Sequence, residues 1–528
     1  MDLPVSIFND VLGPVMRGPS SSHTAAAARI GQLAQQLAGE DLQKAVVEFA
    51  PDGSLATTYH NQGSDIGLAG GLLGLPLSSP DLLKSLSLAV QKGLDIQFYI
   101  RKFEAPHPNT YKLSLTTAGG SSFCLTALST GGGMIQITEI DGFPVEIYGD
   151  YWELLLYISD TPGDITDQVK ITCHTLFQNI AFESYAIYHQ NQNCLLHLKF
   201  SQALEEKTIA CITRQFNCNK YRYSLPVLPI TSGSKNRILF HSATELENAL
   251  PKPDTQLWEM ALKYESQRGN ISEDNVWEMA ADILKTMRQA VQTGLQGTFY
   301  KNRILQQQSH LMENAAAAHL LQAPLINKIS QYTMAVMETK SSFGTIVAAP
   351  TAGSCGAIPG AILGCADCCG FTKEDCIKAL LAAGIVGVLI AHRSTFSAEI
   401  AGCQAECGSA SSMAAAAIVQ LMGGPARTAL RATSFALQNI FGMVCDPVAN
   451  RVEVPCLGKN ILAATNGFTA ANLITAGIDA VLPLDEVIAA MDEVGRSLPV
   501  KLRCTALGGL SVTPTSKAIE EQLKDLDK

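Results

Sequence analysis

The feature that most restricts the fold of this chain is the stretch 333–440, which contains long apolar segments rich in alanine and glycine. Helices with such small side chains can lie very close together, so this composition is typical of helices buried in a bundle. The most apolar run, Ala379–Ala391, is shorter than the roughly 20 residues that a membrane-spanning helix needs. The second half of the chain is therefore predicted to be mostly α-helical and to stay outside membranes.

The composition excludes several classes of function. The 528 residues are 47% hydrophobic and 16% charged, which is enough for a large core and about three domains. The net charge is −10 and aromatic residues make up 6%, so neither a basic surface nor stacking platforms for nucleic acid are expected. The 15 cysteines are unevenly spaced, and Met1–Ser6 does not read as a signal peptide. A reducing compartment and a cytoplasmic protein are expected.

Three cysteines of the segment 397–458 stand within two residues of a glycine or proline. Cys403 follows a glycine, Cys445 precedes an Asp-Pro pair and Cys456 follows a proline, so all three are expected in loops. Loop cysteines can turn toward a shared metal, but a single buried cysteine often serves as a small apolar side chain. The nearest match to a Cys-x-x-Cys pair, Cys365–Cys369, lies in a predicted helix and has no second pair at zinc-finger spacing. The spacing alone leaves both interpretations open.

Two loops carry hydroxyl groups that a core would not need. Gly18–Thr24 reads Gly-Pro-Ser-Ser-Ser-His-Thr before a predicted helix at Ala25–Leu37, and such a helix N-terminus favours anions such as a carboxylate. Helix capping is the alternative, although a single serine would be enough for it. Pro350–Gly356 reads Pro-Thr-Ala-Gly-Ser-Cys-Gly between two apolar segments. Both loops are candidates for a functional site.

These segments closely resemble the iron–sulfur-dependent L-serine dehydratases (L-serine ammonia-lyases). The similarity to the α part of that family lies in Ala349–Gly356, Gly402–Glu406, Cys445–Pro447, Val454–Cys456 and Arg503–Thr515. The similarity to the β part lies in Gly18–Thr24, His107–Thr110, Gly131–Gly133 and Glu139–Pro144. The order of these motifs implies a β part fused to an α part in one chain.

The resemblance implies α,β-elimination of L-serine to pyruvate and ammonia, a lyase reaction of amino-acid catabolism that can serve gluconeogenesis. It assigns a [4Fe–4S] cluster to Cys403, Cys445 and Cys456, and three ligands leave one iron open as a Lewis acid. By the same resemblance, the residues expected to take part in catalysis are Ser22, His23, Asp65 and His107. The residues expected to bind the substrate or line the site are Ser20, Ser21, Thr24, Asn109, Thr351, Gly353 and Ser354.

One motif departs from the family pattern. In Asn61–Asp65, Gln62 stands where relatives carry a histidine, and glutamine cannot relay a proton at neutral pH. Either His60 takes over that role, or His23 or a serine carries the chemistry, or the substrate differs. The alternative functions are therefore elimination from another β-substituted amino acid, as in a cysteine desulfidase or threonine dehydratase, and a non-enzymatic amino-acid or iron–sulfur sensor.

Three units are predicted. Residues 1–152 are expected to form an α+β domain like the family's β part, in which Asp141-Gly142 marks a hairpin turn. Residues 153–230 are expected to form a small ACT-like βαββαβ domain ending in a strand at Tyr223–Ile230. Residues 231–528 are expected to form an all-helical catalytic domain like the family's α part. An amino acid is the expected ligand, without nucleic acid or membrane partners, and a homodimer is the expected assembly.

Overall fold

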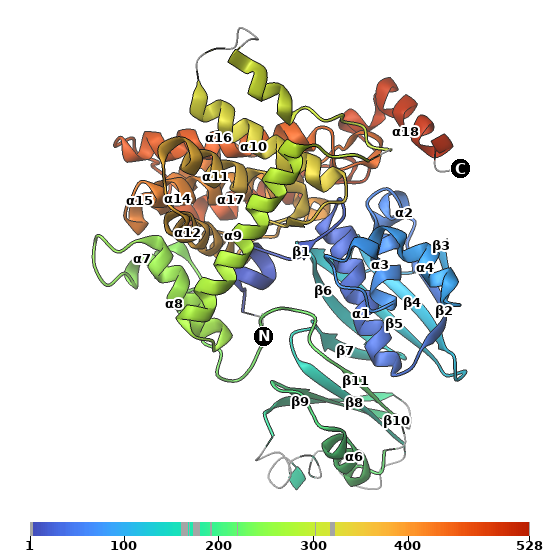
Figure 1. Cartoon of the computed structure of the whole chain (residues 1–528). Helices are drawn as coiled ribbons and strands as arrows, with labels where there is room; N and C mark the ends of the chain where they lie inside the picture. The colour runs from blue at the N-terminus through green and yellow to red at the C-terminus, as the bar shows by residue number, and fades with distance from the viewer. Residues whose placement is uncertain are drawn as a thin grey trace.

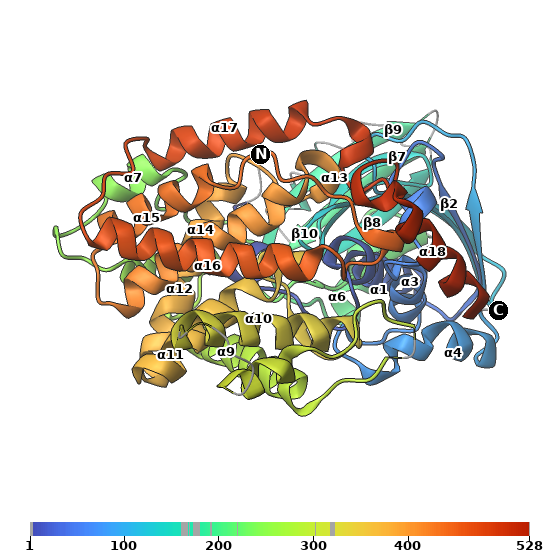
Figure 2. The same cartoon turned by 90° about the horizontal axis from the view of Figure 1, so that it is seen from above.

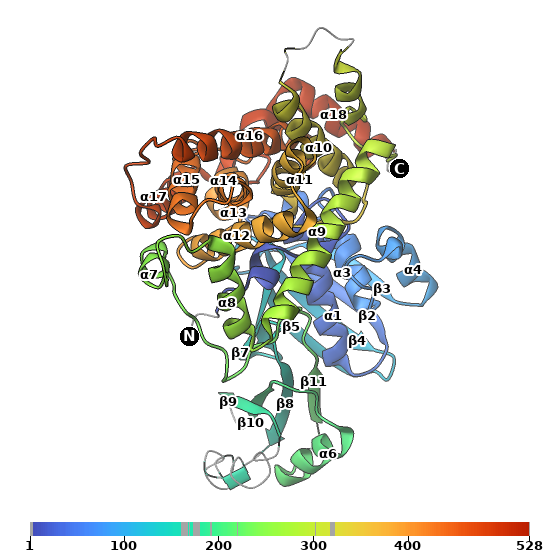
Figure 3. The ribbon, with the colours of Figure 1, turned by 60° about the vertical axis from the view of Figure 1, so that its left-hand side comes forward.

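The computed structural model describes residues 4–159, 167, 169, 171–172, 180–190, 193–218, 220–300, 302–316, 321 and 323–526. Two β-sheets lie in the N-terminal part of the chain, and the C-terminal half is a bundle of helices (Figure 1). The smaller sheet lies at the end of the molecule farthest from the C-terminal helices, as Figures 1 and 3 agree. The prediction of a mixed α and β N-terminal part and a helical C-terminal part is confirmed.

The N-terminal sheet has six strands in the order β3-β2-β4-β5-β6-β7, of which β2 and β3 run parallel and the other neighbours antiparallel. Helices α1 (Ala26–Ala38) and α3 (Ser64–Leu72) share a buried core with this sheet. They touch through glycine, because a Cβ added at Gly71 would lie 2.0 Å from the Ala28 carbonyl oxygen. The strands are β2 (Leu42–Phe49), β3 (Asp95–Ile100), β4 (Thr110–Thr117), β5 (Ser122–Gly131), β6 (Met134–Ile140) and β7 (Phe143–Ile147).

The predicted hairpin turn between β6 and β7 is confirmed. Asp141 and Gly142 both have positive φ angles, 51° and 85°, as a type I′ turn requires. The remaining helices of this part are α2 (Leu55–Thr58) and α4 (Ser85–Gln91).

The second sheet has four antiparallel strands in the order β11-β8-β10-β9, with α6 (Glu206–Gln215) on one face. Its strands are β8 (Trp152–Ser159), β9 (Phe182–Gln190), β10 (Asn193–Phe200) and β11 (Lys220–Ser224). The helix expected between β8 and β9 falls largely outside the described residues. The predicted strand Tyr223–Ile230 is wrong, because the strand ends at Ser224 and Pro226 and Pro229 beyond it have no N–H to donate.

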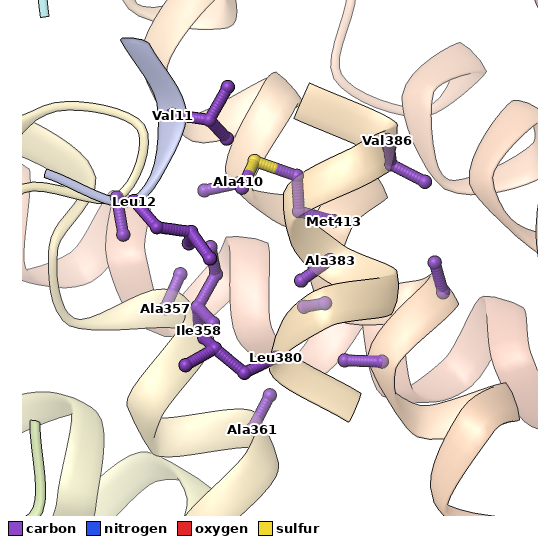
Figure 4. Close-up of a cluster of buried hydrophobic side chains, with 14 of the residues drawn as sticks. Val11, Leu12, Ala357, Ile358, Ala361, Leu380, Ala383, Val386, Ala410 and Met413 are labelled. Carbon is purple, nitrogen blue, oxygen red and sulfur yellow. The ribbon is translucent and has the colours of Figure 1, made fainter. Parts of the chain in front are cut away.

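Small residues set the spacing of the helical bundle. Helices α12 and α14 are buried on nearly all sides, and Figure 4 shows their alanines packed beside Leu380 and Met413. A Cβ added at Gly294 would lie 2.0 Å from the Ala335 carbonyl oxygen, so α9 and α10 meet backbone to backbone. Figure 2 shows α16 running alongside α14 and α15. The longer helices are α8 (Leu257–Gly269), α9 (Glu273–Gln296), α10 (Pro324–Ser341), α11 (Ala357–Cys369), α12 (Lys373–Ala391), α14 (Ser409–Leu421), α15 (Ala426–Gln438), α16 (Cys456–Thr475), α17 (Leu484–Ser497) and α18 (Pro514–Leu526).

One described helical stretch is long and apolar enough to cross a membrane by length and composition alone. It covers Ala352–Cys369, and 83% of it is buried inside the protein. Its apolar character is therefore that of a core helix, as the composition of the bundle predicts.

The first residues of the chain join the two halves. The turn Ile7–Val11 (η1) packs inside the bundle, where a Cβ added at Gly387 would lie 2.1 Å from Val11. The short strand β1 (Val15–Met16) then pairs with β12 (Ile346–Val347) of the bundle. This arrangement brings the serine-rich loop that follows β1 close to the 350–356 loop that follows β12.

Candidate active site

The serine-rich loop lies between the six-stranded sheet and the bundle and is fastened to both. Residues Ser21–Ala25 form one helical turn (η2) at the start of α1. Ser21 Oγ accepts the N–H of Ala352 at 3.1 Å, and Thr24 Oγ1 donates to the carbonyl of Gln62 at 2.8 Å. Ser21 and Thr24 therefore hold the loop in place by contacts with other parts of the chain.

The hydrogen bonds of His23 determine its neutral tautomer. Its Nε2 lies 2.8 Å from the Thr58 hydroxyl, whose single hydrogen is donated to the Ser54 carbonyl at 2.7 Å. Thr58 must therefore accept, so Nε2 of neutral His23 carries the hydrogen. The lone pair on Nδ1 then faces the hydroxyls of Ser20 and Ser22, at 3.1 and 3.2 Å. This nitrogen can accept a proton inside the site.

Glu399 comes from the bundle and completes this group. Ser22 Oγ donates to Glu399 Oε1 at 2.8 Å, and His23 Nδ1 lies 3.6 Å from the same oxygen. Burial would raise the pKa of Glu399, but the charge that His23 carries once it is protonated, together with hydrogen bonds from Ser397 and Ser22, lowers it below its ordinary value. Burial lowers the pKa of His23, against the opposing charge of Glu399. At neutral pH the pair is thus a carboxylate beside a neutral imidazole.

These shifts predict a loss of stability in acid. The folded-state pKa of His23 is below its ordinary 6.5, so the unfolded chain binds that proton more tightly and the folded state loses stability as the pH falls through 6.5. Glu399 adds a further loss below its ordinary value of 4.5. We expect the free energy of unfolding in urea to fall between pH 6.5 and about 5, and to fall less in a His23→Gln variant. His107, whose pKa burial also lowers, is present in both proteins. An identical pH dependence in the two proteins would contradict a neutral, buried His23.

His107 and Asn109 supply polar atoms that no other described group satisfies. His107 Nδ1 accepts the N–H of Asn109 at 3.1 Å, so its hydrogen is on Nε2, and this atom has no hydrogen-bond partner. Both side-chain amide atoms of Asn109 are buried and unpaired as well. Ser129 links them to the serine-rich loop, since its N–H donates to the Asn109 carbonyl and its hydroxyl to the Ser22 carbonyl. Unpaired buried groups are costly, and here they point to a polar ligand.

On the bundle side, the 350–356 loop surrounds a second glutamate, Glu406. Thr351 Oγ1 donates to Glu406 Oε1 at 2.5 Å. A Cβ added at Gly353 would lie 2.5 Å from the same oxygen, so a larger residue here would displace the Glu406 carboxylate. Ser354 Oγ donates to the Ala349 carbonyl and holds the shape of the loop. Thr351 and Gly353 therefore contact Glu406 on the side of the cysteines, whereas Ser354 stabilises the loop itself.

The three cysteines of the expected cluster lie together and are buried. Cys403 is 3.9 Å from Cys407 and within hydrogen-bond reach of Cys445, and it interacts electrostatically with Cys456. A fifth thiol, Cys504, lies beside Cys445, since its N–H donates to the Cys445 carbonyl at 3.0 Å in the backbone bridge between Cys445 and Arg503. The prediction that Cys456 lies in a loop is wrong, because it is the first residue of α16. Among the described residues, no three acidic, histidine or cysteine side chains could hold a single metal ion.

Lys459 and Asn460, which follow Cys456 in α16, support the thiols from one side. Lys459 Nζ donates to Asp446 Oδ1 at 3.0 Å and to the Val444 carbonyl at 2.6 Å, and its charge acts on three of the cysteines. The amide of Asn460 donates to the Gly353 carbonyl at 2.7 Å and lies 3.9 Å from Cys407 Sγ. Asn460 thereby ties the glycine of the 350–356 loop to the thiol group.

The side chains of Asp65 and Gln62 make their hydrogen bonds with residues other than His23. Asp65 Oδ2 is 2.6 Å from His60 Nδ1, and its other oxygen accepts the Ile66 N–H. Gln62 is buried, and its amide donates toward Cys504 Sγ at 3.6 Å. His60, the partner of Asp65, also lines an open cavity of about 670 Å³. The structure therefore places Asp65 with His60 at the edge of the site, separate from the group formed by His23 and Glu399.

Several residues of the site were missed by the sequence reasoning. The residues that hydrogen-bond around Glu399, and those that surround the cysteines, come together only through contacts between distant parts of the chain. Motif spacing carries no signal for them, although Glu399 and Glu406 lie in the segment around Cys403 that the sequence singles out. The residues are Thr58, Ser129, Glu399, Glu406, Cys407, Lys459, Asn460 and Cys504.

Comparison with known proteins gives consistent matches over both halves of the chain. Residues 252–511 match the family model described as serine dehydratase alpha chain. The chain is 35% identical over 286 residues to the probable L-serine dehydratase, alpha chain, of Bacillus subtilis (strain 168), covering 54% of this chain and 95% of that protein. It is 41% identical over 166 residues, 31% of this chain, to 74% of the probable L-serine dehydratase, beta chain, of the same organism. It is 27% identical over 503 residues to L-serine dehydratase 2 of Escherichia coli (strain K12), covering 94% of this chain and 96% of that protein.

Proposed function

This chain belongs to the L-serine dehydratase family, and from that premise we propose that it converts L-serine to pyruvate and ammonia by α,β-elimination. The observation that carries the proposal is the group of Ser22, His23 and Glu399. Two of these residues come from the N-terminal part and one from the bundle. The Ser22 hydroxyl donates to Glu399, and Nδ1 of neutral His23 lies 3.2 Å from the Ser22 hydroxyl and 3.6 Å from Glu399 Oε1. Such a group can take up a proton at a defined atom and stabilise the resulting charge.

Substrate binding is proposed for the unpaired atoms near this group. The Asn109 amide offers both a donor and an acceptor, and the Nε2–H of His107 offers a second donor. Donors of this kind bind a carboxylate, and an amide oxygen binds an ammonium group. Serine carries both groups on its α-carbon, so binding here would place the α-carbon next to the hydroxyls of Ser20 and Ser22.

The proposed reaction uses Nδ1 of His23 as the base. The α-proton of serine passes to Nδ1, the electron pair of the C–H bond forms the Cα–Cβ double bond, and hydroxide leaves from the β-carbon. The Glu399 carboxylate stabilises the imidazolium that forms. The released aminoacrylate tautomerises to an imine, which water hydrolyses to pyruvate and ammonia.

The donor atoms of the buried cysteines fit an iron–sulfur cluster. Cys403, Cys445 and Cys456 would hold it, since thiolates are the usual protein ligands of such clusters. Neighbouring thiols, above all Cys407, hold the pKa of Cys403 well below its ordinary value, whereas contacts with Cys403 and Cys504 raise the pKa of Cys445 and burial raises that of Cys456. Of the three, Cys403 alone is favoured as a thiolate before a cluster binds. When bound, a [4Fe–4S] cluster with one iron free of a protein ligand supplies a Lewis acid for the β-hydroxyl.

The position of Gln62 supports one alternative. Its amide faces Cys504, so the side of the site next to the thiols differs in chemistry from one that carries a histidine. L-cysteine differs from L-serine in its leaving group, a thiol in place of the hydroxyl, and L-threonine keeps the hydroxyl but adds a methyl group on the β-carbon. Either difference would be accommodated on that side of the site. The alternative is therefore elimination from another β-substituted amino acid by the same group of residues.

We further propose that the four-stranded unit is an ACT-like regulatory domain. Its described part has three strands, a helix and a fourth strand in sequence, with the order β11-β8-β10-β9. Domain limits at 152 and 230 would place a domain boundary at the loop before β8 and another after Pro229. A cytoplasmic homodimer is proposed for the whole protein.

The direct test is an anaerobic assay of the iron-reconstituted full chain with L-serine, L-threonine and L-cysteine. We expect pyruvate and ammonia in equal amounts from L-serine, with the highest kcat/KM of the three substrates. A higher kcat/KM for L-threonine or L-cysteine would support the alternative and contradict serine as the substrate. The absence of any keto acid would overturn the proposed elimination.

A further inference from the structure

A second cavity, of about 520 Å³, lies between the N-terminal segment, the chain that follows β11, and α9. Most of its wall is apolar and comes from Leu12, Leu77, Val227 and Ile283, among others. One cation, Arg29 of α1, lines it. The cavity is separate from the group formed by His23, Glu399 and the cysteines, none of which lines it.

Arg29 is buried without a charged partner of its own. It is 1% exposed, and its Nη1 donates to the Gly133 carbonyl and contacts Met134 Sδ at 3.7 Å. Its Nε has no hydrogen-bond partner, and among the described residues no carboxylate lies within 4.0 Å of its guanidinium. Asp10 acts on it from a greater distance, and the Asp10 carboxylate accepts the N–H of Ser6. Buried charges in proteins are normally paired, so this guanidinium lacks an anion.

We propose that this cavity binds a small aliphatic carboxylate. The carboxylate would pair with the guanidinium of Arg29, which is suited to two parallel hydrogen bonds with such a group. The hydrocarbon part would pack against the wall formed by Leu12, Val227 and Ile283. Branched-chain acids of five or six carbons match this combination of one buried cation and an apolar wall.

The carboxylate could belong to a simple acid or to an amino acid. Asp282 lies exposed at the rim of the cavity, where it could pair with an ammonium group. Two probes separate these sources, namely 4-methylpentanoate, which has no ammonium group, and L-leucine, which has one. Tighter binding of L-leucine that is lost in Asp282→Asn would support an amino acid as the ligand. Equal binding of the two probes would support a simple carboxylic acid.

The test is calorimetric titration of the full-length protein, so it does not depend on the proposed activity. We expect saturable binding of 4-methylpentanoate with one site per chain, and no binding of the uncharged 4-methylpentanamide. Arg29→Gln should weaken binding by at least about tenfold, because it removes a charged hydrogen-bond donor. Met279→Trp keeps Arg29 but fills the cavity from α9, and it should also weaken binding. This second variant tests the site even if Arg29→Gln does not fold.

Three results would overturn the proposal. The first is no saturable binding of either acid at millimolar concentration. The second is equal binding of the acid and the amide, which would show that the guanidinium plays no part. The third is unchanged binding in a folded Arg29→Gln or Met279→Trp protein, which would place the ligand elsewhere.

Discussion

Replacement of His23 by glutamine is expected to lower kcat with L-serine by about 10²–10⁴-fold. The variant keeps a hydrogen-bonding side chain but loses the Nδ1 lone pair that faces Ser20 and Ser22. Among the described residues, the hydrogen bonds of His23 go to no cysteine, so the visible absorbance of the reconstituted cluster should be unchanged. KM should change less than kcat, because the proposed substrate contacts are made by Asn109 and His107. Steady-state kinetics together with iron and sulfide analysis measure both quantities.

His60→Gln is the matched control for this variant. His60 is the histidine nearest in sequence to Gln62, its side chain is 58% exposed, and it pairs with Asp65 rather than with Glu399. We expect its kcat to remain within about threefold of the wild-type value, as for a residue outside the proton transfer. A large loss in His60→Gln together with near-normal turnover in His23→Gln would move the base to His60 and contradict the proposed mechanism.

Replacement of Cys445 by alanine is expected to abolish both cluster absorbance and lyase activity. Cys445 lies within hydrogen-bond reach of Cys403 and is fixed by a backbone bridge to the segment around Arg503. Loss of one of three thiolate ligands leaves a cluster held by two, which should not survive purification. Anaerobic reconstitution followed by visible spectroscopy, iron analysis and a pyruvate assay gives the result. Retained turnover with a full complement of iron would refute the ligand role.

Cys194→Ala controls for the loss of any buried thiol. Cys194 is buried in β10 of the four-stranded sheet, in a core separate from the bundle. We expect this variant to keep both absorbance and activity. Cys504→Ala tests the thiol next to Cys445, and retention of the full iron content in this variant would leave Cys403, Cys445 and Cys456 as the ligand set.

Periodicity was a reliable guide to those parts of the fold that depend on local sequence. The small-residue pattern of 333–440 predicts the bundle, because a helix that is apolar on every side is normally buried in a protein core. Asp141-Gly142 predicts its hairpin, because few other residues adopt two successive left-handed conformations. The strand predicted at Tyr223–Ile230 failed, since its apolar residues stand beside prolines that cannot join a ladder.

The candidate site was predictable only where a motif carries its own chemistry. The serine-rich loop and Cys403, Cys445 and Cys456 stand out in the sequence, and the structure brings them to one region through Glu399 and Glu406. In the sequence the two glutamates look like ordinary helix residues, and their role is visible only in the structure, where the bundle packs against the N-terminal part. Asp65 shows the converse, because its motif is recognisable but its carboxylate turns to His60.

The burial of the first residues inside the bundle has a consequence for how the two halves stay associated. Ser6 and the Ile7 N–H bind Glu265 of α8 at 2.5 and 2.7 Å, and β1 pairs with β12. These contacts are independent of the polypeptide that connects the halves near Thr231–Lys235. We therefore expect a chain nicked by protease in that connector to elute from a sizing column as one intact particle.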